Sequence, residues 1–84
     1  MRSGHIDEVS AHVARILREE RESRGLSMTT LAERAGLSQA MISFVEREIR
    51  NPSLATLLRI AYVLEIDLGN VIQRANKAAV KKFR

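Results

Sequence analysis

Residues 39–44 carry the most distinctive side-chain chemistry in this sequence of 84 residues. On a helix over this stretch, the outward face would present Gln39, Ala40, Ser43 and Phe44, none of which is charged. The amide can donate and accept hydrogen bonds, the hydroxyl can do either, and the methyl group and the ring make apolar contacts. Because no nucleophile with a neighbouring base is visible in the sequence, we expect contact with another molecule rather than enzymatic catalysis.

The composition excludes several other kinds of site. There is no cysteine, so disulfides and thiolate metal sites are excluded, and a cytoplasmic setting is expected. His5 and His12 have no clustered partners, so neither a metal nor a cofactor is expected. No apolar run approaches the roughly 20 residues that span a bilayer, and no signal peptide is visible. The sequence therefore predicts one small domain without membrane contact.

The net charge of +4 is unevenly distributed. Residues 1–67 contain nine Lys and Arg against ten Asp and Glu, a net charge of −1, whereas residues 68–84 contain five cations and no acid. The basic character therefore belongs mainly to the C-terminal segment. Total charge alone is weak support for nucleic-acid binding, and the positions of the arginines must decide it.

Helices must position these residues, because apolar side chains recur at helical spacing and no strand-like alternation occurs. The pattern predicts an all-α fold with five helices, over about residues 7–24, 28–35, 39–47, 54–65 and from 68 onward. Four residues can cap the last four of these helices at their N-termini, namely Ser27, Ser38, Ser53 and Asp67. The inward stripe predicted for the fourth helix is Leu54, Leu57, Leu58, Ala61 and Leu64.

We expect three segments along the chain. Residues 1–6 form an N-terminal extension and residues 7–73 form the folded domain. Residues 74–84 form a basic C-terminal extension, which could continue the fifth helix because its apolar and cationic residues fall on separate helical faces.

Gly36 interrupts the helix-forming run of residues 33–48, and we interpret the run as two helices. A glycine one position past a short helix supplies the left-handed conformation that other residues reach only at a cost. Leu37 can then pack into the core, and Ser38 can cap the next helix. Two short helices joined by such a turn match a helix-turn-helix, whose second helix fits the major groove of DNA.

Several stretches in register resemble the Cro/phage-repressor (Xre-type) helix-turn-helix family. They are GLS before the second helix, LAERAGLS through the turn, IS..ER in the third helix, RNPS in the next loop and L..LLRIAYVL in the fourth helix. The resemblance covers most of residues 9–72. It implies a five-helix, lambda-repressor-like DNA-binding domain, most similar to small stand-alone repressors and to the controller proteins of restriction–modification systems.

The resemblance also implies that Gln39, Ala40, Ser43 and Phe44 face the major groove. The amide of Gln39 could pair with N6 and N7 of adenine, whereas Ala40 and Phe44 could contact a thymine methyl group. Ser43 can donate or accept and would select little. Helical spacing places Phe44 between the inward face and solvent, so base contact and core packing both stay open for this ring.

Phosphate contacts are expected from residues around the two helices of the motif, namely Ser27, Thr29, Arg47, Arg50 and Asn51. The first two lie at a helix N-terminus, where free N–H groups and the helix dipole favour an anion. The arginines flank the recognition helix and can reach the DNA backbone. Arg21 and Glu46 correspond to a family ion pair that joins the first helix to the recognition helix.

Three positions depart from the family pattern. Met28 replaces a common glutamine that contacts phosphate and supports the first residue of the recognition helix, so Gln39 is expected to be held less firmly. Glu48 replaces a common glycine, so the recognition helix is expected to end later or without a left-handed residue. Glu65 replaces another common glycine at the end of the fourth helix.

The leading hypothesis is a sequence-specific transcriptional regulator that binds double-stranded DNA as a homodimer on an inverted repeat. Two copies are expected because one recognition helix covers only a few base pairs. The residues expected at the dimer interface are Tyr62, Val63, Ile66, Val71 and Ile72. The alternative is an antitoxin-like or other protein-interaction module, whose protein partner would bind the C-terminal segment.

Overall fold

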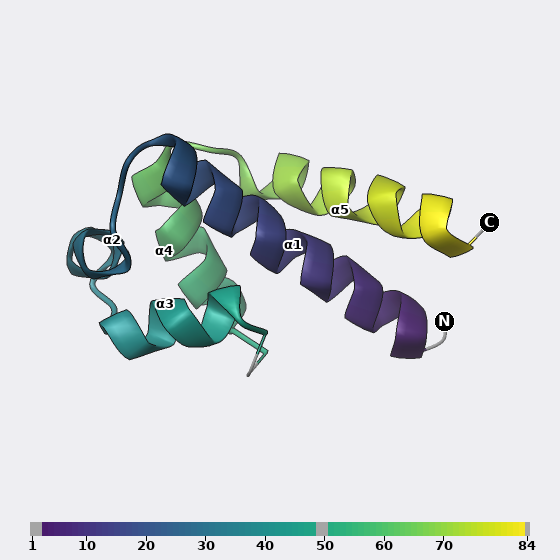
Figure 1. Ribbon diagram of the computed structural model, residues 1–84, viewed down its shortest axis with the longest axis horizontal. Helices are drawn as coiled ribbons and strands as arrows, with labels where there is room; N and C mark the ends of the chain where they lie inside the picture. The colour runs from purple at the N-terminus through teal and green to yellow at the C-terminus, as the bar shows by residue number, and fades with distance from the viewer. Residues whose placement is uncertain (1–2, 49–50, 84) are drawn as a thin grey trace.

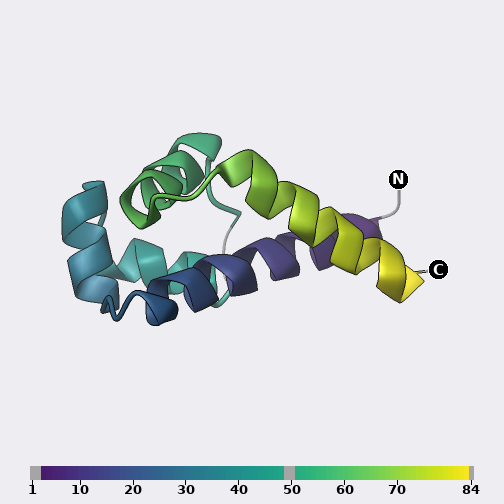
Figure 2. The same ribbon diagram turned by 90° about the horizontal axis from the view of Figure 1, so that it is seen from above.

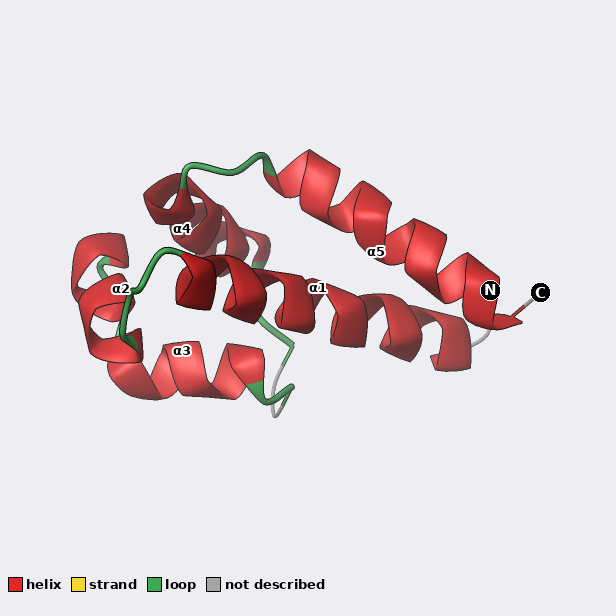
Figure 3. Cartoon of the chain, turned by 45° about the horizontal axis from the view of Figure 1, so that its top comes forward, coloured by secondary structure: helices red, strands yellow, loops and turns green. Residues whose placement is uncertain are grey.

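The computed structural model describes residues 3–48 and 51–83, with side chains described for residues 4–48 and 51–80. In this part of the chain there are five α-helices and no strand, as the sequence predicts (Figure 3). None of these helices combines the length and the apolarity needed to cross a membrane. The helices are α1 (Ser3–Ser23), α2 (Met28–Ala35), α3 (Gln39–Glu46), α4 (Leu54–Leu64) and α5 (Leu68–Phe83).

The predicted caps are present at the starts of α2, α3, α4 and α5. In the first three, a serine hydroxyl oxygen accepts a hydrogen bond from the backbone N–H three residues later, at 3.0 to 3.1 Å. Before α5, Asp67 Oδ1 accepts the Gly69 N–H at 3.0 Å. These bonds satisfy N–H groups that have no partner within the helix, and so they fix where each helix begins. The capping serines are Ser27, Ser38 and Ser53.

Left-handed residues follow the C-terminal ends of four helices. Gly25 and Gly36 have φ angles of 67° and 69°, and Glu48 and Glu65 adopt the same conformation with φ angles of 59° and 58°. Of the two alternatives predicted for the end of α3, a later end was wrong, because the helix stops at Glu46. Its C-cap, Arg47, has a φ of −97° and is not left-handed, as the second alternative predicts, and the left-handed residue is the next one, Glu48. Since the left-handed conformation costs an L-residue about 1 to 2 kcal/mol, Glu48 and Glu65 carry local backbone strain.

All five helices contribute to one hydrophobic core. The register of α4 differs from the prediction, because Ile60 is buried while Leu54 and Leu58 are 64% and 50% exposed. Nine of the eleven residues of α4 are apolar or aromatic, so the spacing of apolar residues could not decide which face lies inward. The most deeply buried large side chains are Leu17, Leu31, Ile42, Ile60, Leu64 and Val71.

α1 and α5 lie side by side and extend together beyond the other helices (Figures 1 and 2). α1 begins at Ser3, four residues earlier than predicted, and α5 runs across the predicted boundary after residue 73. Ala75 and Ala79 are completely buried where α5 packs on α1. The beginning of the expected C-terminal extension is therefore part of the packed domain, because small side chains allow the two helices to approach closely.

Candidate nucleic-acid interface

The corner between α2 and α3 is built as the sequence predicts. Gly36 takes the left-handed conformation, and its N–H and that of Leu37 donate to the carbonyls of Glu33 and Ala32 at 3.3 and 2.9 Å. The half-buried Leu37 packs against the core. A Cβ at residue 36 would lie 3.3 Å from Nη1 of Arg59, so a larger residue there would require the Arg59 side chain to shift by a few tenths of an ångström. This geometry holds α2 and α3 as two helices in a fixed arrangement.

α3 has an apolar face that packs on the core and an uncharged face that is exposed to solvent. Ile42 and Val45 are buried, Gln39 and Ala40 are exposed, and Ser43 is half-buried. The structure therefore places three of the four predicted base-contacting residues on the outer side of α3, two of them, Gln39 and Ala40, in its first turn. The fourth, Phe44, is half-buried. This intermediate burial does not decide between base contact and core packing for its ring.

Met28 and Gln39, the first residues of α2 and α3, are in contact. Gln39 Nε2 donates to Met28 Sδ at 3.7 Å, and Met28 itself packs against the core. Gln39 therefore keeps a hydrogen-bond partner at residue 28, because the thioether sulfur accepts from its amide. That Gln39 is held less firmly than with a glutamine at residue 28 stays a prediction. Sulfur is a weak acceptor, but it lies on a side chain that the core holds in place.

Four of the five residues expected at phosphates lie in the described part of the chain, and all four are exposed. Ser27 and Thr29 lie at the start of α2, beside the N-terminus of α3. Arg47 is the C-cap of α3, at the opposite end of that helix. Asn51 follows in the next loop, and Arg50 lies outside the described residues. Polar groups are thus available on both sides of the exposed face of α3, as phosphate contacts would require.

Arg21 and Glu46 form the predicted ion pair between α1 and α3. Arg21 Nε and Nη2 donate to the two carboxylate oxygens of Glu46 at 2.7 and 3.0 Å, and both side chains are buried. Arg21 Nη1 donates to the Leu26 carbonyl at 2.7 Å. Hydrogen bonding to the Glu46 carboxylate outweighs burial and raises the pKa of Arg21. The guanidinium therefore ties the end of α3 and the loop before α2 to α1.

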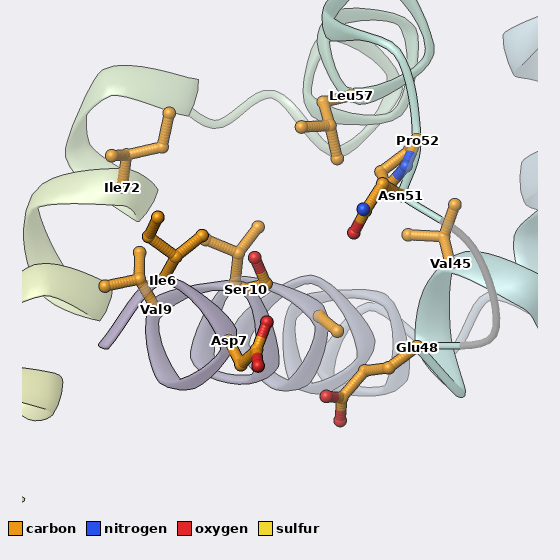
Figure 4. Close-up of a pocket in the computed structure, with 12 residues that line it drawn as sticks. Ile6, Asp7, Val9, Ser10, Val45, Glu48, Asn51, Pro52, Leu57 and Ile72 are labelled. Atoms are coloured by element: carbon orange, nitrogen blue, oxygen red, sulfur yellow. The ribbon is translucent and has the colours of Figure 1, made fainter. Parts of the chain in front are cut away.

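A hollow of about 510 Å³ lies between the N-terminal half of α1 and the loop after α3 (Figure 4). Apolar side chains such as Ile6, Val9 and Leu57 form its walls, and the carboxylates of Asp7 and Glu48 lie among its lining residues. Neither Lys nor Arg is among the described residues that line it. Because this lining is mainly apolar and includes two carboxylates, the hollow is unsuited to a phosphate, although Asn51, one of the residues expected at phosphates, lies at its border.

A helix-turn-helix family model matches residues 17–70, which is more than half of the chain. This chain belongs to the Xre/Cro/C1-type helix-turn-helix family. The family is one of DNA-binding transcriptional regulators and is not enzymatic. The match spans the whole corner between α2 and α3, together with the Arg21–Glu46 ion pair that supports it.

Curated relatives of this helix-turn-helix domain come from bacteria, a bacteriophage and an archaeon. The transcriptional regulator SutR of Escherichia coli is 32% identical over 73 residues, and SinR of Bacillus subtilis is 27% identical over 62 residues. These matches cover 87% and 73% of the chain. The chain spans only 41% of the length of SutR and 56% of that of SinR, so it corresponds to a part of each.

Solved structures share the fold of this helix-turn-helix domain. The regulator ClgR of Corynebacterium glutamicum superposes with a TM-score of 0.78 at 22% identity, covering 88% of this chain and 79% of ClgR. A variant of the restriction–modification controller protein C.Esp1396I gives 0.76 at 25% identity, covering 87% and 95%. SinR in complex with DNA gives 0.67 at 28% identity, covering 71% and 97%.

An exposed apolar surface of this helix-turn-helix domain lies on α4 and at the start of α5. Tyr62 is 84% exposed, and it lines a shallow hollow of about 460 Å³ with Leu54, Leu58, Ile66 and Ile72. We call these five residues the α4–α5 patch. Three of them were expected at a dimer interface, and Val63, also expected there, is half-buried beside them.

Val71 does not belong to this surface. It is 1% exposed in the core of the chain, so its assignment to a dimer interface was wrong. Leu54 and Leu58 were missed, because the pattern of apolar residues in α4 predicts them on its inward face. Leu54, Leu58 and Tyr62 follow one another at intervals of four residues, which was the available signal, since residues at i, i+4 and i+8 share one helical face.

Proposed function

We propose that this protein is a transcriptional regulator that binds double-stranded DNA sequence-specifically, with α3 in the major groove. The observation that carries the proposal is the division of α3 into a buried face, with Ile42 and Val45, and an exposed, uncharged face that begins with Gln39. An α-helix fits the major groove, and amide, hydroxyl and methyl groups match the base edges there. The similarity to SinR, solved in complex with DNA, supports the same conclusion.

Contacts to the DNA backbone would fix the register of α3 in the groove. In this proposal, Ser27 and Thr29 bind phosphate at the start of α2, and Arg47 binds phosphate at the far end of α3. Hydrogen bonds from such groups position a protein on the duplex without selecting its sequence. Selection then depends on Gln39, with apolar contacts from Ala40 and weaker polar contacts from Ser43.

The proposal includes a homodimer that binds an inverted repeat. A single recognition helix contacts too few base pairs to distinguish one genomic site, and two-fold symmetric proteins bind two half-sites. The α4–α5 patch supports this assembly, because a two-fold interface needs one self-complementary surface. Tyr62, Leu54 and Leu58 are large apolar or aromatic side chains on one face of one helix, suited to such a contact.

Selection of bound sequences from a random duplex library tests the proposed function. We expect enrichment of an inverted repeat whose half-sites lie about one helical turn apart. Gln39→Ala is the matched variant: it should lose preference at one base pair of each half-site while it still binds DNA. If no sequence is enriched, or if Gln39→Ala loses affinity equally on selected and random duplexes, the proposal is wrong.

The structure gives no support to the alternative of a protein-interaction module. That function would use residues 74–84 as a surface for a protein partner. Ala75 and Ala79 instead lie buried between α5 and α1, and Arg74 pairs with Glu20. Residues 74, 75 and 79 of the segment therefore make contacts within the domain.

A further inference from the structure

We propose that Met28 is a positioning residue that makes Gln39 select adenine over guanine. This inference deepens the proposed function and depends on it. It starts from the hydrogen bond that Gln39 Nε2 donates to Met28 Sδ at 3.7 Å. The two residues are the first of α2 and of α3, so the contact lies where the recognition helix would enter the groove.

The chemistry of the thioether fixes which way the Gln39 amide faces. A thioether sulfur accepts hydrogen bonds and donates none, so it attracts the amide NH2 group and offers nothing to the carbonyl oxygen. A residue that both donates and accepts would tolerate either orientation of the amide. At residue 28 of this chain, only the orientation with Nε2 toward the sulfur gains a hydrogen bond.

The backbone around both residues is also fixed. Ser27 and Ser38, which precede Met28 and Gln39, each cap the helix that follows. Met28 is half-buried and packs against the core, whereas Gln39 is exposed. The sulfur is therefore the fixed partner, and the amide is the group whose orientation responds to it.

The groups that stay available on Gln39 match adenine. One of the two amide N–H groups is engaged by Met28, which leaves one donor and the Oε1 acceptor. In the major groove, adenine presents the N7 acceptor and the N6 donor, so a single donor and a single acceptor pair with it bidentately. Guanine presents two acceptors, O6 and N7, and would need both N–H groups. Recognition of guanine would therefore break the bond to Met28.

The test measures affinity for four duplexes that differ at one base pair. The parent duplex is the one enriched from a random library, and the variable base pair is the one at which Gln39→Ala loses preference. For the unsubstituted chain we expect adenine to be favoured over guanine by about tenfold or more. M28L keeps an apolar side chain of similar volume but removes the acceptor, and the ratio should fall by about threefold.

A third variant reverses the hydrogen-bonding chemistry. M28K places a donor at residue 28, which would attract Oε1 of Gln39 and turn both N–H groups outward. The adenine-to-guanine ratio should therefore fall further than in M28L. Because a lysine can also contact guanine O6 and N7 directly, M28K is compared in the background of Gln39→Ala as well, where it should leave the ratio unchanged. An equal ratio in all three proteins would mean that Met28 only fills space, and would overturn the inference.

Two controls separate positioning from other roles of Met28. In the background of Gln39→Ala, M28L should leave the ratio unchanged, and a persistent effect would mean that residue 28 acts on DNA directly. In the free protein, M28L should shift the side-chain amide proton resonances of Gln39, and unchanged resonances would contradict the hydrogen bond. Specific binding with an unchanged ratio refutes this inference alone, whereas absence of any enriched sequence refutes the proposed function as well.

Discussion

Arg21 and Glu46 form a buried, bidentate ion pair that joins α1 to the last residue of α3, at 2.7 and 3.0 Å. Two parallel N–H···O bonds give such a pair directional specificity as well as charge attraction. The pair therefore sets the position of α3 relative to the core, and both of its side chains are buried. Its third hydrogen bond, to the Leu26 carbonyl, extends this support to the loop before α2.

Removal of one partner of this pair should destabilise the domain strongly. We expect Glu46→Leu or Arg21→Met to lower the free energy of unfolding by about 3 kcal/mol, because the remaining charged group is left buried without its partner. Urea denaturation measures this loss. The matched control is Arg21→Met combined with Glu46→Leu, which should recover part of the stability because no unpaired charge remains. If the double variant is as unstable as the sum of the single variants, the pair does not act as a unit.

Local signals predicted the features that depend on adjacent residues. The glycine at residue 36 and the serines at 27, 38 and 53 specify turns and caps through bonds within three or four residues, and each is found as predicted. The Arg21–Glu46 pair spans 25 positions, and it was predicted only through the resemblance to the family. The roles of α3 side chains toward DNA stay predictions.

Features that depend on packing between helices were not predictable from spacing. α4 is apolar around most of its circumference, so the inward face was chosen wrongly at Leu54 and Leu58. The close packing of α5 on α1 depends on Ala75 and Ala79, small residues that give a weak hydrophobic signal. The Arg74–Glu20 ion pair joins residues 54 positions apart, and no local pattern indicates it.

Glu20 should make the stability of the domain depend on pH. A hydrogen bond from Arg24, together with the charges of Arg24 and Arg74, outweighs the effect of burial and holds the pKa of Glu20 below its ordinary value of 4.5. A carboxyl with a lowered pKa in the folded state stabilises above its unfolded pKa, and this contribution is lost as pH falls through the folded pKa. The stability difference between the unsubstituted chain and Glu20→Gln should therefore be present at neutral pH and disappear in acid.

Urea denaturation of both proteins from neutral to acidic pH measures that difference in the free energy of unfolding. The contributions of other carboxylates, which titrate in both proteins, cancel in it. Addition of salt should reduce it at neutral pH, because the pairs of Glu20 are partly exposed. A difference that stays constant from neutral to acidic pH would contradict the role given to this carboxylate.

Glu65→Gly should stabilise the domain. Glu65 caps α4 in the left-handed conformation, which costs an L-residue about 1 to 2 kcal/mol. Glycine removes this cost, but it loses more backbone entropy on folding, which destabilises by about 0.5 to 1 kcal/mol. We therefore expect the free energy of unfolding to rise by about 0.5 kcal/mol. Thermal unfolding measures it. Gly36→Ala is the opposite case and should destabilise, because residue 36 has a φ of 69° and its new Cβ would lie 3.3 Å from Arg59 Nη1.

Arg47 and Lys77 should affect the salt dependence of DNA binding differently. Arg47 caps α3, whereas Lys77 lies on α5, which is on the other side of α1 from α3 (Figure 1). Arg47→Gln should reduce the slope of log affinity against log salt by about 1, because one phosphate contact is lost. Lys77→Gln should leave the slope unchanged. Equal slopes for the two variants would remove Arg47 from the DNA interface, and a reduced slope for Lys77→Gln would place α5 in it.

Leu58 and Ile6 provide a matched test of the α4–α5 patch as a dimer interface. Both are exposed aliphatic side chains, at 50% and 49%, but only Leu58 belongs to the patch. Leu58→Glu would place a charge in a self-complementary apolar contact, twice per dimer, and should weaken dimerisation by about tenfold or more. Ile6→Glu should leave it unchanged. Sedimentation equilibrium measures both constants, and binding to an isolated half-site should survive in Leu58→Glu because α3 is untouched. An equal loss of dimer in both variants, or a monomeric unsubstituted chain at tens of micromolar, would remove the patch from the assembly.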